Sequence, residues 1–379
     1  MYLSNRSRKK AYIQAILMFH SLCIALSLFL SFIEVKVSAD TTSFAKNNAE
    51  FMNGLQKQLE QQTSFNNSKR NTSQSLKFLS YNIQLSGLDT PTHLWEDRKV
   101  AVSTLLSYAD IIALQEITYS QLLYLKMELP SYDFIGFNTV TGRDLLELSS
   151  DKQEGLVIAF RRDVFILQST EMLWYSDTPN VPSQRWGTWT SAFPKALQKA
   201  TLAFKVNGKE IDIFNSHFAH DEDPGELINP RILSSLMELG LLKSCSHRYW
   251  ISAGDRNFHE PRDTPAYELY TNSPFLCDSK ASALTCWGNT TFMGYEDHPR
   301  ANLLMPDGTF AKNYYLDILF HNSHLISSHW WTAHLGEYNE KLHLLPIGNC
   351  RQFSKRLFAS DHAAIFVEYG LFDFWDFSE

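Results

Sequence analysis

The sequence predicts a layered α/β sandwich. Short apolar segments typical of buried strands recur between residues 78 and 369, whereas only two segments have the spacing typical of amphipathic helices. Many strands with few helices between them favour stacked sheets over a doubly wound sheet, in which helices alternate with the strands. Composition agrees, because 44% of the residues are hydrophobic and 13% are aromatic, which suits a chain with a large buried core.

The predicted elements begin with a β–α–β unit: a strand over residues 78–83, an amphipathic helix over 96–108 and a buried strand over 110–115. A later helix is expected over residues 231–239, since Pro230 suits a first helical position and Gly240 the position just past the end. Further strands are expected at Leu156–Phe160, Ala200–Val206, Ile211–His217, Tyr249–Ala253, Tyr315–Phe320, Leu325–Trp331 and Ala363–Tyr369.

The N-terminal segment is typical of an export signal. Basic residues between positions 6 and 10 precede an apolar run over 15–33, and Val37-Ser38-Ala39 offers small residues at a cleavage site. The run is also long enough for an uncleaved membrane anchor. We predict a signal peptide or signal anchor over residues 1–39, a polar linker over 40–76 and the folded domain over 77–379. The protein is expected to be secreted or periplasmic, or membrane-anchored by residues 15–33.

Charge and cysteine content narrow the function classes. The 34 Lys and Arg against 41 Asp and Glu give a net charge of −7, so no global basic field holds nucleic acid non-specifically. Cys23 would leave with the signal, which leaves Cys245, Cys277, Cys286 and Cys350 with three possible pairings. A disulfide between Cys277 and Cys286 is the pairing we expect first, and free buried thiols are an equally open alternative.

Polar residues recur where the predicted strands end. Strand ends converge along one edge of a sheet, so side chains that are distant in sequence can meet in one cleft. Carboxylates, amides and two histidines together supply the ligands that a hard cation prefers and groups for acid/base chemistry. The candidates are Asn82, Glu116, His217, Asp255, Asn257, Asp317, Asp361 and His362.

These residues belong to motifs in a fixed order: SYNIQ at 80–84, ALQEI at 113–117, FNSH at 214–217, AGDRN at 253–257, LDILF at 316–320 and SDH at 360–362. In order, spacing and strand context the sequence resembles the endonuclease/exonuclease/phosphatase superfamily of deoxyribonuclease-like, metal-dependent phosphoesterases. Segments 142–144, 154–161 and 173–182 resemble its deadenylase-related bacterial branch. The resemblance implies a four-layered αββα sandwich with two packed mixed β-sheets and an active site at one edge.

The resemblance also implies a metal centre and a carboxylate–imidazole pair. Glu116 would be the main metal ligand, with Asn82 and Asp361 nearby, and the ion would be Mg²⁺, for which Mn²⁺ can substitute. Asp317 would orient the ring of His362 and stabilise its charge. His362 would then assist the attack or stabilise the pentavalent phosphorus transition state.

The remaining implied roles concern water and phosphate. Asp255 would position the attacking water and Asn257 would bind a phosphoryl oxygen; strand alternation places these two residues on the same side. Glu154 would pair with His217, which would present a donor to a phosphate oxygen near the leaving group.

Arg256 departs from the family pattern, which usually has an apolar or aromatic residue between Gly-Asp and Asn. If Arg256 points into the sandwich it needs an anionic partner. Otherwise it is, with Arg143, a candidate contact for the phosphate of the substrate.

The resulting functional hypothesis is an exported, divalent-metal-dependent phosphoesterase that hydrolyses a phosphodiester by in-line water attack. A nuclease is preferred, with nucleic acid as the substrate, no organic cofactor and a monomeric state. The alternative is a sphingomyelinase-like phospholipid phosphodiesterase or phosphatase, which would bind a phospholipid head group and insert Trp330 and Trp331 at the membrane interface. In the competing interpretation these tryptophans pack on either side of a strand. A catalytically inactive exported binding module is a further alternative.

Overall fold

The computed structural model divides the chain into two units, Met1–Ser73 and Gln74–Glu379, and the described residues all belong to the second. The described ranges are 75–89, 93–186, 189–190, 193–220, 229–245, 249–259, 263–288, 290–294, 314–338, 341–346, 355–357 and 359–371. The predicted signal segment, most of the predicted linker and Cys350 lie outside these ranges. None of the helices within them has the length and apolar character needed to cross a membrane.

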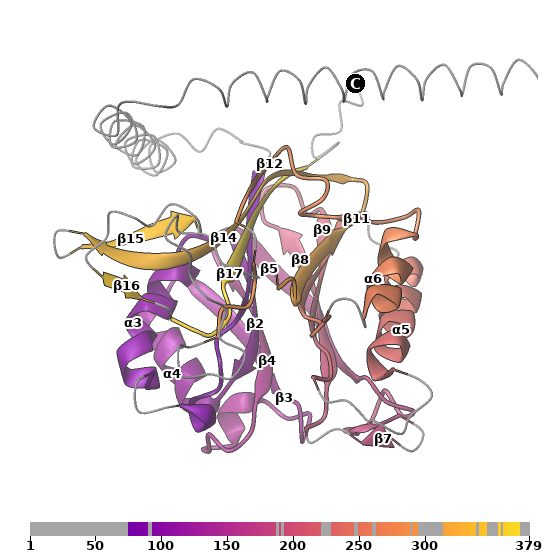
Figure 1. Cartoon of the computed structure of the whole chain (residues 1–379), viewed down its shortest axis with the longest axis horizontal. Helices are drawn as coiled ribbons and strands as arrows, with labels where there is room; N and C mark the ends of the chain where they lie inside the picture. Colours follow the sequence, from indigo (N-terminus) through magenta and orange to yellow (C-terminus); the bar gives the residue numbers. More distant parts are fainter. Residues whose placement is uncertain are drawn as a thin grey trace, which may run out of the picture. The chain divides into compact units, whose positions relative to one another are not determined.

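Two β-sheets lie against each other in the described domain (Figure 1). The strands of the first sheet follow the order β12-β14-β17-β1-β2-β4-β3, with β15 and β16 also paired to β14. They are β1 (Ser75–Asn82), β2 (Ile111–Ile117), β3 (Tyr132–Asn138), β4 (Gly155–Arg161), β12 (Thr285–Trp287), β14 (Leu325–Tyr338), β15 (Lys341–Pro346), β16 (Lys355–Leu357) and β17 (Ala364–Leu371).

The second sheet has the order β11-β13-β10-β9-β8-β5. Its strands are β5 (Phe165–Trp174), β8 (Ala196–Phe204), β9 (Glu210–His217), β10 (Tyr249–Asp255), β11 (Cys277–Asp278) and β13 (Asp317–His321). Both sheets are mixed, because β1 and β2 run parallel, as do β9 and β10, while other pairs are antiparallel. A separate two-stranded ribbon joins β6 (Arg185–Trp186) to β7 (Trp189–Thr190).

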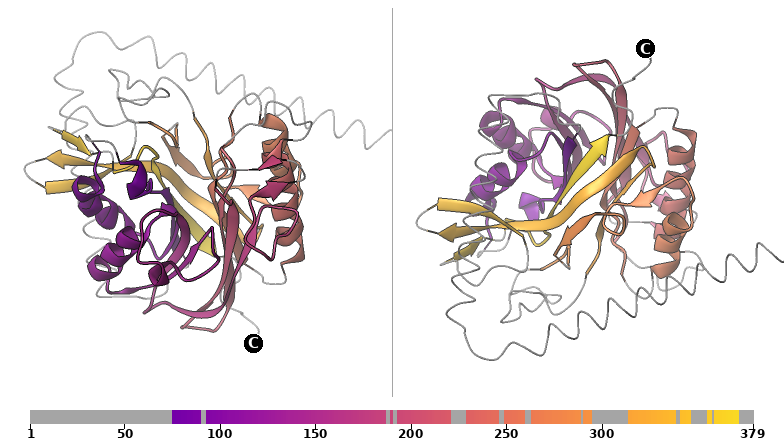
Figure 2. Two further views of the ribbon diagram at one scale, coloured as in Figure 1. Left: turned by 90° about the horizontal axis from the view of Figure 1, so that it is seen from below. Right: turned by 90° about the horizontal axis from the view of Figure 1, so that it is seen from above.

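Helices cover the outer face of each sheet. On the first sheet lie α3 (Trp95–Leu106) and α4 (Tyr119–Glu128), and on the second lie α5 (Pro230–Ser244) and α6 (Thr264–Thr271), as Figures 1 and 2 show. Short 3₁₀ turns follow β1 and β3, at Ser86–Leu88 and Leu145–Glu147. The predicted four-layered αββα sandwich is therefore confirmed.

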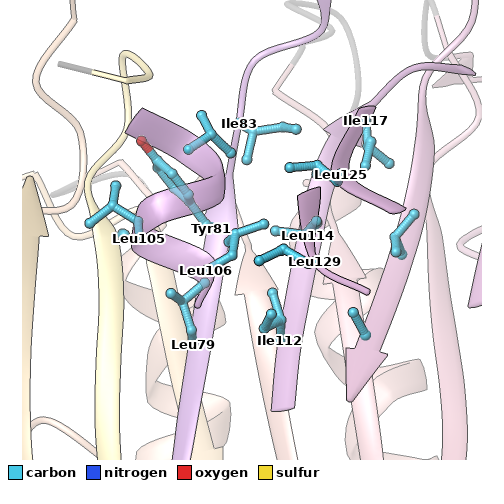
Figure 3. Packing of buried hydrophobic residues seen from close by; sticks show 14 of the residues in the cluster. Leu79, Tyr81, Ile83, Leu105, Leu106, Ile112, Leu114, Ile117, Leu125 and Leu129 are labelled. Atoms are coloured by element: carbon cyan, nitrogen blue, oxygen red, sulfur yellow. The ribbon is translucent and has the colours of Figure 1, made fainter. Parts of the chain in front are cut away.

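Alternation along the central strands of the first sheet builds two of the hydrophobic cores that the described residues form. In β2, Ile112 and Leu114 pack with α3 and α4 (Figure 3), whereas Ile111 and Ala113 enter the core between the sheets. Side chains of a strand point alternately to its two faces, so a strand buried on both faces reads as a continuous apolar run. This explains why β2 could be predicted from its continuous run of apolar residues.

The predicted helices and strands are present, although most of their ends are shifted. Among the predicted helices, the larger difference is at the C-terminal end of the helix over residues 231–239, which is α5. Helix α5 starts at Pro230, as expected, and the side chain of its N-cap Asn229 accepts a hydrogen bond from the Arg231 amide at 2.9 Å. It continues through Gly240 to Ser244, because Leu242 extends the buried face. Burial of this additional turn outweighs the weak helix propensity of glycine.

Among the longer elements, α4, α6, β3 and β5 were not predicted, and neither were the short strands β6, β7, β11, β12, β15 and β16. Helix α4 carries a capping box, in which the backbone N–H of Thr118 donates to Gln121 Oε1 at 2.8 Å and the Thr118 side chain accepts from the backbone of residue 121. That T-x-x-Q pattern is a usable start signal. Strand β5 is an edge strand whose middle residues are exposed, so it lacks the apolar run by which the other strands were recognised.

The cysteine and tryptophan predictions have clear outcomes. Cys277 and Cys286 are free thiols, so the expected Cys277–Cys286 bridge is absent, and the Cys245 thiol donates to Asp212 Oδ2 at 2.7 Å. Cys277 lies in a strand of the second sheet and Cys286 in a strand of the first.

Trp330 is buried between the sheets, and Trp331, on the opposite side of β14, stacks on the ring of residue 366 with centroids 5.3 Å apart. The two tryptophans pack on either side of a strand and offer no membrane-inserting pair.

Candidate active site

The predicted strand-end residues meet at one edge of the two sheets. Asn82 ends β1 and Glu116 lies near the end of the parallel strand β2. In the second sheet, His217 and Asp255 pair directly at the ends of the parallel strands β9 and β10. Asp317 begins the antiparallel strand β13 directly opposite residue 255, and residue 362 lies just before β17, which is antiparallel to β1.

Close approach of β9 and β10 depends on Gly254. This residue has a φ of 143°, and a Cβ atom there would collide with the backbone oxygen of Ser216. Only glycine adopts such a conformation routinely. The absence of a side chain at this position therefore allows His217 and Asp255 to lie side by side.

Glu116 and Asn82 form the first part of the site. Glu116 has a left-handed φ of 56° at an irregularity in the pairing of β2 with β4, which re-aims its side chain. Asn82 Nδ2 donates to Glu116 Oε1 and to Asp255 Oδ2, both at 3.0 Å, while its Oδ1 accepts from the backbone N–H of Gln84 at 3.1 Å. Asn82 thus orients two carboxylates and bridges the two sheets.

The side chains of His362 and Asp317 lie within hydrogen-bonding distance, as the predicted carboxylate–imidazole pair requires. His362 Nδ1 lies 2.8 Å from Asp317 Oδ2, and its Nε2 lies 3.7 Å from Asp255 Oδ2. Burial alone would lower the pKa of His362, but the carboxylates of Asp317 and Asp255 outweigh it and raise the pKa well above its usual value. The ring of Phe292 packs edge-on against the imidazole with centroids 5.0 Å apart.

Asp255 and Asn257 are placed by the turn that follows β10. The Asn257 N–H donates to Asp255 Oδ1 at 2.9 Å, and its side-chain amide donates to the backbone oxygen of Phe218 at 3.1 Å. Asn257 has a left-handed φ of 50°. Burial and the nearby Asp317 raise the pKa of Asp255. The carboxyl group of Asp255 therefore takes up a proton at a higher pH than an ordinary aspartate does.

A buried lysine joins the predicted pair of Glu154 and His217. The pair itself is close, with Glu154 Oε1 3.7 Å from His217 Nδ1. Lys195 Nζ lies 2.8 Å from Glu154 Oε1 and 3.2 Å from His217 Nε2. Burial, and after it the charge of Lys195, lowers the pKa of His217 well below its usual value, so the imidazole is neutral at physiological pH.

The site has the chemistry of a divalent-cation centre. Two overlapping groups could each hold an ion, with their ligand atoms within 4.8 Å of one another: Glu116, His217 and Asp255, and Asp255, Asp317 and His362. Burial, followed by the charges of Glu154 and Asp361, raises the pKa of Glu116 to about 7. A bound cation would offset this concentration of negative charge, and oxygen-rich ligands are those that Mg²⁺ prefers. The residues present therefore fit the ion.

The remaining predicted residues lie in different surroundings. Asp361 is partly buried and accepts from Ser360 Oγ at 3.2 Å, near enough to influence Glu116 electrostatically. Arg143 is exposed and forms an ion pair with Glu147 at 2.8 Å.

The prediction that Arg256 contacts substrate phosphate is wrong. Its side chain is fully buried and pairs with Glu238 at 2.7 Å. Ser252 and Gly254 alternate with Ala253 and Asp255 along β10, so position 256 faces α5 rather than the site edge. The anionic partner that an inward-pointing arginine requires comes from that helix.

Sequence reasoning missed Lys195, Phe292 and Thr291. Thr291 Oγ1 accepts from the N–H groups of residues 316 and 317 at 2.9 and 3.0 Å, which fixes the start of β13. None of the three belongs to one of the strand-end motifs. Lys195 precedes β8 rather than ending a strand, so no local signal distinguishes it from a surface lysine.

Comparisons with known proteins identify the fold. No family model matches the chain. An uncharacterized protein of Acanthamoeba polyphaga mimivirus is 28% identical over 256 residues, which cover 65% of this chain and 87% of that protein. An endonuclease/exonuclease/phosphatase protein of Bacteroides vulgatus matches with a TM-score of 0.60 and 20% identity, over 78% of this chain and 99% of that chain.

Two further structures are informative. Mannosyl-6-phosphatase of Bacteroides thetaiotaomicron matches with a TM-score of 0.59 and 22% identity, over 78% of this chain and 99% of that chain. TDP2 of D. rerio, complexed with a single-strand DNA product, matches with a TM-score of 0.51 and 19% identity, over 78% of this chain and 98% of that chain. The chain therefore has the fold of endonuclease/exonuclease/phosphatase proteins, with a candidate metal site at the sandwich edge.

Proposed function

We propose that this protein is a divalent-metal-dependent phosphoesterase that hydrolyses its substrate by in-line attack of water. The observation that carries this proposal is the convergence of Glu116, Asp255 and the Asp317–His362 pair at one sheet edge, with ligand atoms within 4.8 Å of one another inside each of two overlapping groups. Glu116, with Asp361 nearby, would hold the ion. The ion would offset the charge that develops on the phosphate and the leaving oxygen.

The chain's own residues would perform the remaining steps. Asp255, whose pKa is raised, accepts the proton of the attacking water. The Asn257 side chain binds a phosphoryl oxygen. His362, kept charged by Asp317 at 2.8 Å, stabilises the pentavalent phosphorus of the transition state. The neutral imidazole of His217 donates a hydrogen bond to a phosphate oxygen near the leaving group.

Within this class we propose a nuclease, exported by its N-terminal segment. Similarity of fold to a DNA-bound TDP2 supports nucleic acid as the substrate. Arg143 remains the proposed phosphate contact outside the metal centre. The phospholipid alternative loses its main argument, because Trp330 is buried between the sheets.

A phosphatase acting on small phosphomonoesters is the second candidate. Burial of Arg256 removes one of the two cationic contacts expected for a polymeric phosphate substrate. Similarity of fold to a mannosyl-6-phosphatase supports this candidate.

A substrate panel tests the proposal. Purified protein with Mg²⁺ is assayed on single-stranded DNA, RNA, mannose 6-phosphate and sphingomyelin vesicles. Asp255→Asn should abolish hydrolysis, whereas Glu171→Gln, an exposed carboxylate of β5, serves as the matched control and should not. Cleavage of DNA or RNA alone supports the nuclease, and release of phosphate from the sugar alone supports the phosphatase. No hydrolysis of any substrate, or full activity of Asp255→Asn, would contradict the proposal.

A further inference from the structure

A charged network lies on the opposite face of the strand that carries the site. Along β10, Ile251 and Ala253 point into the core between the sheets, and the inner face continues to Asp255 at the edge. Ser252 of β10 and Arg256, which directly follows the strand, point to the outer face, which α5 covers (Figure 1). Arg256 therefore separates two site residues along the chain while its side chain lies behind them.

Arg256 attaches to the backbone at several points around the site. Its Nη1 donates to the backbone oxygen of Ile318, one residue past Asp317, and to that of Gly254 at 3.4 Å. Its own N–H donates to the backbone oxygen of Leu316 at 2.9 Å. These contacts tie the end of β10 to the start of β13, the two segments that carry Asp255 and Asp317.

Glu238 of α5 completes the network. Its Oε1 accepts from Arg256 Nη2 at 2.7 Å, and its Oε2 accepts from Ser216 Oγ at 3.2 Å. Ser216 immediately precedes His217. Two tyrosine hydroxyls, those of Tyr175 and Tyr270, also donate to Oε2, each at 3.1 Å. One carboxylate thus connects the ends of β9 and β10 through buried hydrogen bonds.

Aromatic rings enclose the guanidinium. Its central carbon lies 5.0 Å from the ring centroid of Phe320, 5.4 Å from that of Tyr270 and 5.8 Å from that of Phe218. The backbone of Phe218 also holds the turn that follows β10 at two points. Its N–H donates to the backbone oxygen of Asp255, and its backbone oxygen accepts from Asn257 Nδ2. The planar guanidinium is held in one orientation, which an ammonium group would not reproduce.

We infer that the buried Arg256–Glu238 pair is the positioning device of the active site, which sets the geometry of Asp255, Asn257 and His217 from behind the sheet. The inference rests on the proposed function. It adds two positioning residues, one of them on a helix that carries no member of the strand-end motifs. Neither residue touches the substrate; both act through the backbone and through Ser216.

Arg256→Lys and Glu238→Gln test this inference beside Leu242→Ala. Leu242 is buried on the same helix and makes no polar side-chain contact, so its truncation destabilises the layer without altering the network. We expect both network variants to lower kcat by at least about tenfold, since a displacement near 1 Å suffices for that. The loss should appear mainly in kcat, and the requirement for Mg²⁺ should persist, because Glu116, the proposed main ligand of the ion, lies on the other sheet and outside the network. Leu242→Ala should keep its kcat despite a lower unfolding midpoint.

Amide hydrogen exchange provides a readout that does not depend on activity. The N–H groups of Phe218 and Asn257 both donate to Asp255. In Arg256→Lys their exchange should accelerate by at least about tenfold, whereas it should not change selectively in Leu242→Ala. Unchanged exchange at both amides in a folded variant would overturn the inference, even if the wild-type protein hydrolyses no phosphoester. Hydrolysis by the wild type together with full kcat in both network variants would overturn it while leaving the proposed function standing.

Discussion

At the scale of single residues, the charge state of His362 is set by its neighbours. The imidazole is buried, which disfavours its charge, yet Asp317 at 2.8 Å and Asp255 at 3.7 Å keep it protonated. A raised pKa means that the stabilisation from this pair is fully present below the ordinary pKa of histidine and is lost as the pH rises through the raised value. Activity that requires a charged His362 should likewise be lost as the pH rises through the raised pKa of this residue.

We predict that Asp317→Asn lowers the rate by roughly 10²–10⁴-fold and shifts the alkaline limit of activity to lower pH. The shift follows because loss of the carboxylate charge lowers the pKa of His362. The pH profile of kcat provides the measurement. In addition, the double variant with His362→Ala should be little slower than His362→Ala alone, since paired groups act as a unit. Additive losses would show that the two residues act independently.

Lys195 is the second residue-scale feature. Its ammonium and the Glu154 carboxylate are each 4% exposed and lie 2.8 Å apart. Lys195→Met should destabilise the protein by about 3–5 kcal/mol, because it leaves a buried carboxylate without its partner. Denaturant unfolding measures the effect. The double variant Lys195→Met/Glu154→Gln should recover a large part of the loss, and a double variant no more stable than Lys195→Met would contradict the account of an uncompensated charge.

At the scale of elements, the contact of β9 with β10 sets the width of the site. Gly254→Ala should destabilise the protein by roughly 1–3 kcal/mol from backbone strain alone, and the collision with Ser216 adds to this cost. Gly240→Ala is the control, because that helical position has open space around it and alanine favours the helix. Thermal unfolding of the two variants should move in opposite directions. Equal stability of Gly254→Ala and wild type would mean that the strands need no close approach.

Individual elements explain how far the sequence could predict this structure. The strands that carry Asn82 and Asp255 are apolar runs ended by polar motifs, so both the elements and the site edge could be predicted. Edge strand β5 could not, because its exposed residues lack that pattern. Burial of Arg256 could not be predicted either, since its partner Glu238 lies on a helix and only tertiary packing brings them together. Lys195 could not be predicted for the same reason, because only tertiary packing brings it to Glu154 and His217.

At the scale of the whole molecule, the predicted site residues all lie among the described residues, and the N-terminal segment is predicted to direct export. We predict that protein recovered from its native host begins near Asp40, because residues 1–39 have the pattern of a cleaved signal. N-terminal sequencing gives the answer. An intact Met1 on membrane-bound protein would favour the anchor alternative, and an intact Met1 on protein free of membranes would contradict both.

The central claim is that this sheet edge binds a divalent cation and uses it to hydrolyse phosphoesters. The most direct test is the Mg²⁺ dependence of hydrolysis for wild type and Glu116→Gln on the substrate that the panel identifies. We predict that EDTA abolishes wild-type activity, that Mg²⁺ or Mn²⁺ restores it, and that Glu116→Gln stays folded but loses this response. Hydrolysis that survives EDTA, or a Glu116→Gln variant with the wild-type metal response, would contradict the claim.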